Sequence, residues 1–167
     1  MTPAVKVALQ TLGWKLAATS SGGGELGSDN GSADFDPAHR RPLRLLIVED
    51  EILTADYMQH LLLELGHEVC GHAVSAETAL RLAKAAKPDF ILMDVNLGRG
   101  GDGISAAQEI LERFGIRSLF VTAYGDRVTM GRAHSAAPIG IVLKPFDKQR
   151  LAIAIAEAQK KAKRGDS

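Results

Sequence analysis

The fold is decided by the stretch Pro88-Asp89-Phe90-Ile91-Leu92-Met93-Asp94. Its apolar run, residues 90–93, is typical of a strand that is buried on both faces in a parallel sheet. The run ends in the carboxylate of Asp94, and a glycine-rich loop follows at residues 98–103. In open α/β sheets, reactive groups stand just past the carboxyl ends of parallel strands. The stretch therefore predicts that Asp94 is a reactive carboxylate.

Apolar strands and amphipathic helices alternate on both sides of this stretch. We predict strands at residues 43–48, 67–73, 89–93, 117–121 and 139–143. We predict helices at residues 52–65, 75–86, 104–114, 124–138 and from 147 onward. Such alternation indicates a parallel sheet with right-handed crossovers. Five strands at this chain length favour an α/β, flavodoxin-like, doubly wound sheet in the order 2-1-3-4-5, with helices on both faces.

Local signals support the helices unequally. The first helix has a core stripe at steps of three and four residues, formed by Ile52, Ala55, Met58, Leu62 and Leu65. Ser75 is expected to cap the second helix, and Gly115 is expected to end the third. The fourth helix is poor, because residues 124–138 include two glycines and a proline.

Composition limits the class of protein. The chain has 167 residues, which is enough for one domain of ordinary size. Its formal net charge is zero, so the overall charge gives no indication of binding to nucleic acid or to an anionic membrane. Cys70 is the only cysteine, which excludes an internal disulfide and a thiolate metal cluster. No apolar run approaches the roughly 20 residues of a membrane span. A cytoplasmic protein is the simplest interpretation.

The chain divides into three parts by composition. Residues 1–42 include a stretch rich in Gly, Ser and Asp, which predicts a disordered or weakly helical extension. Residues 43–164 form the predicted folded domain, and residues 165–167 form a tail.

Polar residues stand at four of the predicted strand ends: Glu49-Asp50, Asp94, Thr122 and Lys144. In a parallel sheet these ends share one edge, so three carboxylates, a hydroxyl and an ammonium should converge. Two carboxylates about 4 Å apart repel each other by roughly 4 kcal/mol at an effective dielectric constant near 20. A divalent cation that prefers oxygen ligands relieves this repulsion, and Mg²⁺ also neutralises charge during phosphoryl transfer. The pattern therefore predicts that Asp94 accepts a phosphoryl group.

From Arg44 to about Lys163 the chain resembles the receiver domain of two-component response regulators. The resemblance rests on four motifs in order: Leu46-Ile47-Val48-Glu49-Asp50, Ile91-Leu92-Met93-Asp94, Phe120-Val121-Thr122-Ala123 and Lys144-Pro145-Phe146. Spacing agrees as well, with 44 positions from Asp50 to Asp94 and 22 from Thr122 to Lys144.

The resemblance implies a role for each site residue. Asp94 is the implied phosphoacceptor, Thr122 the switch hydroxyl, and Lys144 the contact to the phosphoryl group. The implied Mg²⁺ ligands are Asp50 directly, Glu49 through water, Asp94, and the backbone carbonyl of Asn96. The Lys144–Pro145 peptide bond is expected to be cis.

The resemblance also implies the partners. A sensor histidine kinase or a histidine phosphotransfer protein would donate the phosphoryl group, so the chain is a stoichiometric phosphoacceptor and not an enzyme with turnover. It would signal to an unknown target by protein contact, as a stand-alone receiver similar to the chemotaxis regulators. The family's kinase-docking face lies on the first helix, where the candidates are Thr54, Tyr57, Met58 and Leu61. Ile153 could belong to a target surface or to a phosphorylation-dependent dimer.

One position departs from the family pattern. The residue three before the lysine is Ile141, where the family usually has Tyr or Phe as a partner of the switch threonine. Tyr124 is the nearest aromatic residue and is a candidate for gating access to the acyl phosphate. Residues 120–125 are similar to the signature of an atypical alphaproteobacterial receiver subgroup that also lacks the aromatic residue. The weak helix that follows would then order on phosphorylation or partner binding.

Two alternatives fit parts of the sequence. Gly98-Arg99-Gly100-Gly101-Asp102-Gly103 satisfies the G-x-G-x-x-G pattern of a nucleotide-binding domain, but it begins four residues past Asp94 and the next strand ends in no acid. A haloacid-dehalogenase-like phosphatase also uses Asp, Thr and Lys, but it needs a second Asp at the position that Asn96 holds. Steady turnover of a phosphate ester would favour the phosphatase, and stoichiometric labelling would favour the receiver.

Overall fold

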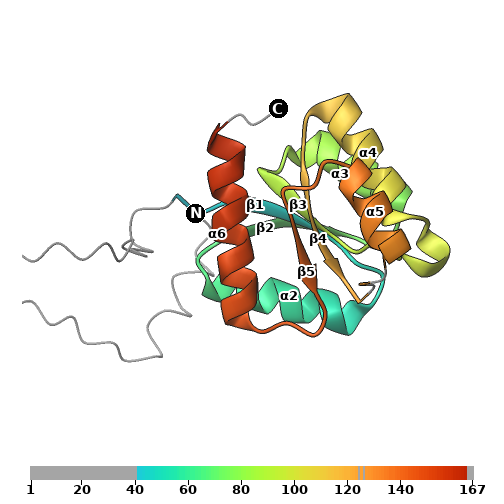
Figure 1. The fold of residues 1–167 in the computed structure, drawn as a ribbon. Coiled ribbons are helices and arrows are strands. Elements are labelled where there is room, and N and C mark those ends of the chain that lie inside the picture. The colour runs from blue at the N-terminus through green and yellow to red at the C-terminus, as the bar shows by residue number, and fades with distance from the viewer. Residues whose placement is uncertain (1–40, 124, 126, 165–167) are drawn as a thin grey trace, which may run out of the picture. The chain divides into compact units, whose positions relative to one another are not determined.

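A single parallel sheet organises the domain. The computed structural model describes residues 41–123, 125 and 127–164. The strands are β1 (Arg44–Val48), β2 (Glu68–Ala73), β3 (Phe90–Met93), β4 (Ser118–Thr122) and β5 (Gly140–Leu143). They lie in the order β2-β1-β3-β4-β5, and every neighbouring pair is parallel (Figure 1). The predicted fold class and strand order are confirmed.

Helices cover both faces of the sheet. They are α2 (Ile52–Glu64), α3 (Ala76–Ala86), α4 (Gly103–Phe114), α5 (Arg127–Ser135) and α6 (Lys148–Arg164). Helices α2 and α6 pack on one face, and α3, α4 and α5 pack on the other (Figure 1). The central strand β3 therefore meets apolar side chains on both sides, which explains why it has no polar position, whereas the edge strand β2 carries Glu68 and His72.

The two faces alternate along the strands with a period of two residues. Leu45 and Ile47 of β1 belong to the core beneath α2 and α6, whereas Leu46 and Val48 belong to the core beneath α3, α4 and α5. All four are completely buried. This continuous burial holds the strands in register and fixes where their carboxyl ends lie.

The predicted helix ends are confirmed where the sequence carries a capping residue. Ser75 Oγ accepts a hydrogen bond from Thr78 N at 3.2 Å and caps α3. Gly115 ends α4 in the left-handed conformation, with φ of 69°. The helix predicted at residues 124–138 is shorter in the structure, because α5 spans only Arg127–Ser135.

The predicted core stripe of α2 is wrong at its first position. Ile52 is 68% exposed, whereas Ala55, Met58 and Leu62 are buried. Ile52 is the first residue of the helix, directly after the strand-end acids, and lies outside the packed core. Leu53 and Tyr57 are exposed as well, so the first half of α2 presents apolar surface to solvent.

The extension and the tail are not described apart from residues 41 and 42. The predicted boundaries at residues 42/43 and 164/165 therefore stay predictions. Among the helices that the structure does describe, none is long and apolar enough to cross a membrane.

Candidate functional site: an acidic pocket at the carboxyl edge of the sheet

The sheet brings the predicted strand-end residues to one edge. Glu49 follows β1, Asp94 follows β3, Thr122 ends β4 and Lys144 follows β5. Because β1, β3, β4 and β5 are parallel neighbours, these four residues stand at the same end of the sheet. Thr122 is 1% exposed, and its backbone carbonyl accepts a hydrogen bond from Lys144 N at 2.8 Å.

Three carboxylates form the centre of the site. Glu49, Asp50 and Asp94 each place a carboxylate oxygen within 4.8 Å of the others. Glu49 is 1% exposed and Asp94 is 7% exposed, whereas Asp50 is open to solvent. Two buried acids with one exposed acid beside them make a half-open group of hard oxygen ligands, as a hydrated Mg²⁺ ion requires.

Lys144 neutralises part of this negative charge. Its Nζ donates hydrogen bonds to Glu49 Oε2 at 2.6 Å and to Asp94 Oδ2 at 2.8 Å. Burial alone would lower the pKa of the Lys144 ammonium, but the hydrogen bonds and charges of Asp94 and Glu49 outweigh that effect and hold the pKa above its ordinary value. Lys144 is therefore a firmly charged partner of the two buried carboxylates.

The charge of Glu49 is not fully compensated. Burial raises the pKa of the Glu49 carboxyl above its ordinary value, and the hydrogen bond and charge of Lys144 only partly oppose that rise. The Glu49 carboxylate also accepts a weak hydrogen bond from Glu51 N at 3.3 Å. A further cation beside Glu49 would favour its ionised form, so the donor set fits a divalent metal ion.

Glycines allow the loops to close around the acids. Gly98 has φ of 53°, and a Cβ there would lie 2.8 Å from Asp50 Oδ2. A Cβ at Gly103 would collide with the backbone carbonyl oxygen of Asp94. The backbone contact excludes a side chain at Gly103, and the left-handed φ strains any other residue at Gly98, which gives the glycine-rich loop a structural role next to the acidic pocket.

The loop after β3 also orients Asp94. Asn96 N donates to Asp94 Oδ1 at 3.2 Å, and the Asn96 side-chain oxygen accepts from Gly98 N at 3.0 Å. One carboxylate oxygen of Asp94 thus faces a backbone amide while the other faces Lys144. This loop carries the backbone carbonyl of Asn96, which the resemblance to receiver domains implies as a metal ligand.

Three further positions are singled out by the resemblance: Ile141, the Lys144–Pro145 bond and Tyr124. Ile141 is half-buried and packs against the core beneath α3, α4 and α5. The Lys144–Pro145 peptide bond is cis. Tyr124 lies outside the described residues, so its gating role stays a prediction.

The docking candidates on α2 divide into two groups. Thr54 and Tyr57 line a pocket of about 420 Å³ together with Lys144, Pro145 and Phe146. The Tyr57 and Phe146 rings lie 5.8 Å apart, and the Tyr57 hydroxyl donates to the Phe146 carbonyl at 3.4 Å.

Met58 and Leu61 do not belong to that surface. Met58 is completely buried and Leu61 is 6% exposed, and both pack in the core beneath α2 and α6. They face the sheet because they lie on the side of the helix that also carries Ala55 and Leu62. Their inclusion among the docking candidates is therefore corrected.

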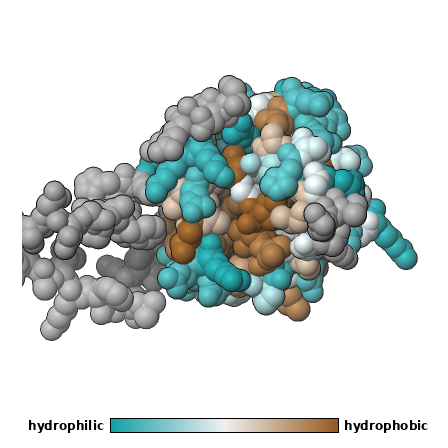
Figure 2. All heavy atoms as spheres, viewed as in Figure 1, coloured by the Kyte–Doolittle hydropathy of each residue, from teal (hydrophilic) through white to brown (hydrophobic). Residues whose placement is uncertain are grey.

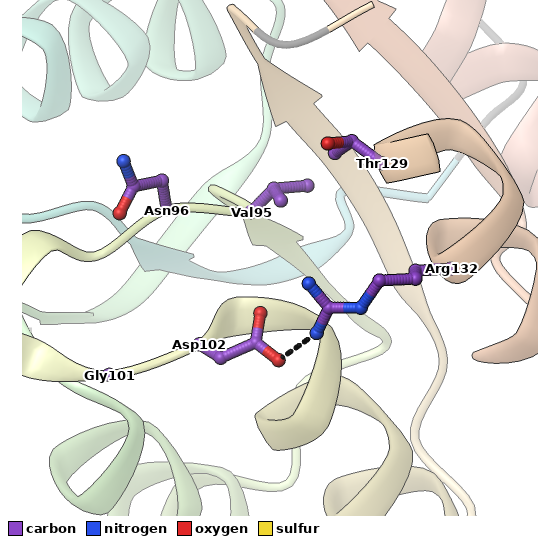
Figure 3. A pocket seen from close by; sticks show the side chains of 6 residues that line it. All are labelled: Val95, Asn96, Gly101, Asp102, Thr129 and Arg132. Atoms are coloured by element: carbon purple, nitrogen blue, oxygen red, sulfur yellow. Dashed lines mark hydrogen bonds and ion pairs between the residues drawn. The ribbon is translucent and has the colours of Figure 1, made fainter. Parts of the chain in front are cut away.

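A second pocket lies beside the loop after β3. It has a volume of about 360 Å³ and is lined by Val95, Asn96, Gly101, Asp102, Thr129 and Arg132. Figure 3 shows Arg132 reaching from α5 to Asp102 at the start of α4, where their ion pair measures 2.6 Å. Asp102 also caps α4, because it accepts hydrogen bonds from Ile104 N and Ser105 N.

This cap bears on the nucleotide-binding alternative. A dinucleotide phosphate would need the first amide groups of α4, and the Asp102 carboxylate already accepts from two of them. The capping role of Asp102 could have been read from its position before the helix, since Asp is a preferred N-cap residue. The pairing of Asp102 with Arg132 has no comparable sequence signal.

The fold and the pocket define an α/β domain with an acidic, lysine-containing site at the carboxyl edge of a 2-1-3-4-5 sheet. The sequence pattern of the response regulator receiver domain matches residues 45–156. The chain belongs to this family, whose members act in two-component signal transduction, where histidine kinases phosphorylate them. Receiver domains are typically phosphoacceptors rather than catalytic enzymes, which disfavours the phosphatase alternative.

Three similar proteins illustrate the family. The transcriptional regulatory protein PdtaR of Mycobacterium tuberculosis is 38% identical over 68% of this chain and 55% of its own length. The chemotaxis protein CheY of Thermotoga maritima is 28% identical over 70% of this chain and 98% of its own length. The solution structure of the PhyR receiver domain of Erythrobacter litoralis is 32% identical, has a TM-score of 0.63 and covers 71% of this chain and 91% of that one. The chain thus spans about half the length of PdtaR.

Proposed function

We propose that Asp94 accepts a phosphoryl group from a phosphohistidine on a sensor kinase or a histidine phosphotransfer protein. One observation carries this proposal: Asp94 follows β3, with carboxylate oxygens of Glu49 and Asp50 within 4.8 Å and the Lys144 ammonium 2.8 Å away. The group combines a carboxylate nucleophile with the charges that phosphoryl transfer needs.

The chemistry follows from the contacts of the two Asp94 oxygens. A carboxylate oxygen of Asp94 attacks the phosphorus, the phosphorus–nitrogen bond to the histidine breaks, and the imidazole leaves with its electron pair. Lys144 then exchanges its contact with Asp94 Oδ2 for a phosphoryl oxygen, and the Thr122 hydroxyl donates to another. Glu49, Asp50, Asp94 and the Asn96 carbonyl would hold Mg²⁺, which supplies neutralisation of the phosphoryl charge.

The response spreads from Thr122 and Lys144. Thr122 ends β4, and the segment after it leads to α5, so a shift of the hydroxyl toward the phosphoryl group pulls on the connection to that helix. Ile141 provides no aromatic ring for this movement. In our proposal, Tyr124 and α5 take its place.

The kinase would dock on the start of α2. Thr54 and Tyr57 line a pocket that also includes Lys144, so a partner bound there would stand next to the phosphoacceptor site. Ile52 and Leu53 add exposed apolar surface, at 68% and 78% exposure. A phosphohistidine presented by a helical partner would thereby reach Asp94.

Output would pass through contact with another protein. Figure 2 shows apolar surface between α6 and α5, over the edge strand β5. Leu143 of β5 and Ile153 of α6 are exposed apolar residues on these elements, at 46% and 48%. We assign this face to a downstream target or to a phosphorylation-dependent dimer.

The test is phosphoryl labelling of the full chain with acetyl phosphate and Mg²⁺. Asp94→Asn should abolish the label, because an amide oxygen is a poor nucleophile and the acyl phosphate cannot form. Asp89→Asn is a matched control, since Asp89 precedes the same strand at its opposite end and pairs with Arg41. Full labelling of Asp94→Asn, or sustained release of phosphate from an ester, would contradict the proposal.

A further inference from the structure

His72 of β2 contacts the backbone of the acidic pocket. Its Nε2 lies 2.8 Å from the carbonyl oxygen of Glu49. A carbonyl oxygen can only accept, so the imidazole donates through an Nε2–H group. We propose that His72 is a positioning residue for the Mg²⁺ site, which holds the peptide between Glu49 and Asp50 so that both carboxylates converge on Asp94. This inference rests on the proposed function.

The peptide between Glu49 and Asp50 is at a point where regular structure stops. Strand β1 ends at Val48 and α2 begins at Ile52, so both acids lie in a three-residue connection. Glu49 N still donates to Ala73 O at 2.9 Å, which is the last backbone contact of Glu49 with β2 because β2 ends at Ala73. The His72 ring extends this support by one group, from the amide to the carbonyl of Glu49.

Support on both sides of Glu49 sets the direction of the next residue. The carbonyl group belongs to the same peptide plane as the amide of Asp50. A fixed carbonyl therefore fixes the rotation of that plane and, with it, the directions in which the Glu49 and Asp50 side chains leave the backbone. Metal-binding carboxylates need this kind of outer support, because their partners normally set ligand orientation.

A bulge in β2 turns His72 toward this carbonyl. In the pairing of β1 with β2, Leu45 faces Val69 but Leu46 faces Gly71, so Cys70 is an extra residue. His72 consequently pairs with Ile47, on the face covered by α2 and α6. Without the extra residue His72 would pair with Val48 and project from the opposite face. Bulges recur next to functional sites because they re-aim a side chain in this way.

The proposal is tested with two substitutions at one position. His72→Phe keeps an aromatic ring but removes the donor, whereas His72→Gln keeps an N–H donor at about the same reach. Mg²⁺ affinity of the full chain is measured by titration calorimetry, and the Mg²⁺ concentration for half-maximal labelling by acetyl phosphate is measured beside it. We expect about tenfold weaker Mg²⁺ binding in His72→Phe, which is the smaller of the losses in metal affinity that follow when a residue supporting a metal ligand is removed. In His72→Gln we expect the Mg²⁺ affinity to stay within about threefold of the wild type.

A second expectation separates positioning from a general loss of structure. The labelling rate at saturating Mg²⁺ should be the same in His72→Phe and the wild type, because excess metal ion restores the arrangement. His72→Leu serves if the phenylalanine variant does not fold. Unchanged Mg²⁺ affinity in both apolar variants, or equal weakening in His72→Gln, would overturn the role of His72 alone. Failure of the wild-type chain to bind Mg²⁺ or to label would instead overturn the proposed function.

Discussion

Replacing Lys144 by methionine isolates the electrostatics of the pocket. The change removes the ammonium that contacts Glu49 and Asp94 at 2.6 and 2.8 Å and keeps an unbranched apolar side chain of similar length. Each contact is worth about 6 kcal/mol of gross attraction at an effective dielectric constant near 20. Desolvation of the ammonium cancels several kcal/mol of that attraction.

The free energy of unfolding should fall by less than it does when an ion pair in the deep interior is broken. Breaking a buried pair costs about 3–5 kcal/mol. The Lys144 side chain is 18% exposed, and water can reach the pocket from the side of Asp50. We therefore expect the free energy of unfolding at pH 7 without Mg²⁺ to fall by about 2–3 kcal/mol. At about 2 kcal/mol per molar urea, the unfolding midpoint should drop by about 1–1.5 M.

Metal ion should reverse part of this loss. Without the ammonium, the three carboxylates present a more negative site, and we expect Mg²⁺ to bind about tenfold more tightly than in the wild type. Mg²⁺ should then stabilise the variant by about 1.4 kcal/mol more than the wild type. Urea denaturation with and without Mg²⁺ measures both effects. Lys148→Met is the matched control, because Lys148 pairs with Glu64 at the surface and its loss should leave the urea midpoint close to that of the wild type. Equal midpoints for Lys144→Met and the wild type without Mg²⁺, or equal stabilisation by Mg²⁺, would refute this account.

Two further predictions concern α5 and acid stability. Arg132→Met should change the free energy of unfolding by no more than about 1 kcal/mol, because the ion pair with Asp102 is partly exposed. The same pair holds α5 against α4, so its loss should speed hydrogen exchange of the α5 amides by about two- to fivefold. Unchanged exchange would contradict that role. Burial lowers the pKa of the His67 imidazole, whose Nδ1 accepts a hydrogen bond from Leu43 N. The neutral imidazole therefore contributes its full stabilisation above a pH of about 6.5, and this contribution is lost as the pH falls through the lowered pKa of the folded state. His67→Asn should flatten the fall in urea midpoint between pH 7.5 and 5, and an unaltered slope would assign that fall to other groups.

Much of the fold could be predicted because it follows from short-range patterns. The run at residues 90–93 requires burial on two faces, and that burial requires helices on both sides of a parallel sheet. Once the strands are parallel, their carboxyl ends share an edge. The gathering of Glu49, Asp94 and Lys144 therefore needed only the strand boundaries, which the sequence placed to within a residue or two.

The facing of α2 could not be predicted in the same way. Its sequence carries large apolar residues around most of the helix, so several stripes fit the periodicity equally well. Packing on the sheet selects the side with Met58 and Leu61 and leaves Ile52 and Leu53 in solvent. The surface that we assign to the kinase is thus the part of the site that sequence reasoning described least accurately.

The environment of His72 was equally hidden. A period of two residues counted from Val69 would assign it to the wrong face, because the bulge at Cys70 shifts the pairing by one. No composition signal marks a bulge of this kind when the extra residue is itself apolar. Contacts that depend on one inserted residue emerge only from the three-dimensional pairing.

If Asp94 accepts a phosphoryl group as we propose, the charge balance of the pocket changes. When ionised, its three carboxylates and the Lys144 ammonium leave two negative charges, which one divalent cation balances. A phosphoryl group on Asp94 replaces one negative charge by nearly two. The added negative charge then lies on the phosphoryl group, and the Lys144 ammonium is the cation in the described pocket that can move toward that group. In the proposed mechanism Lys144 gives up its contact with Asp94 Oδ2 for a phosphoryl oxygen, and this movement would couple phosphorylation to the end of β5.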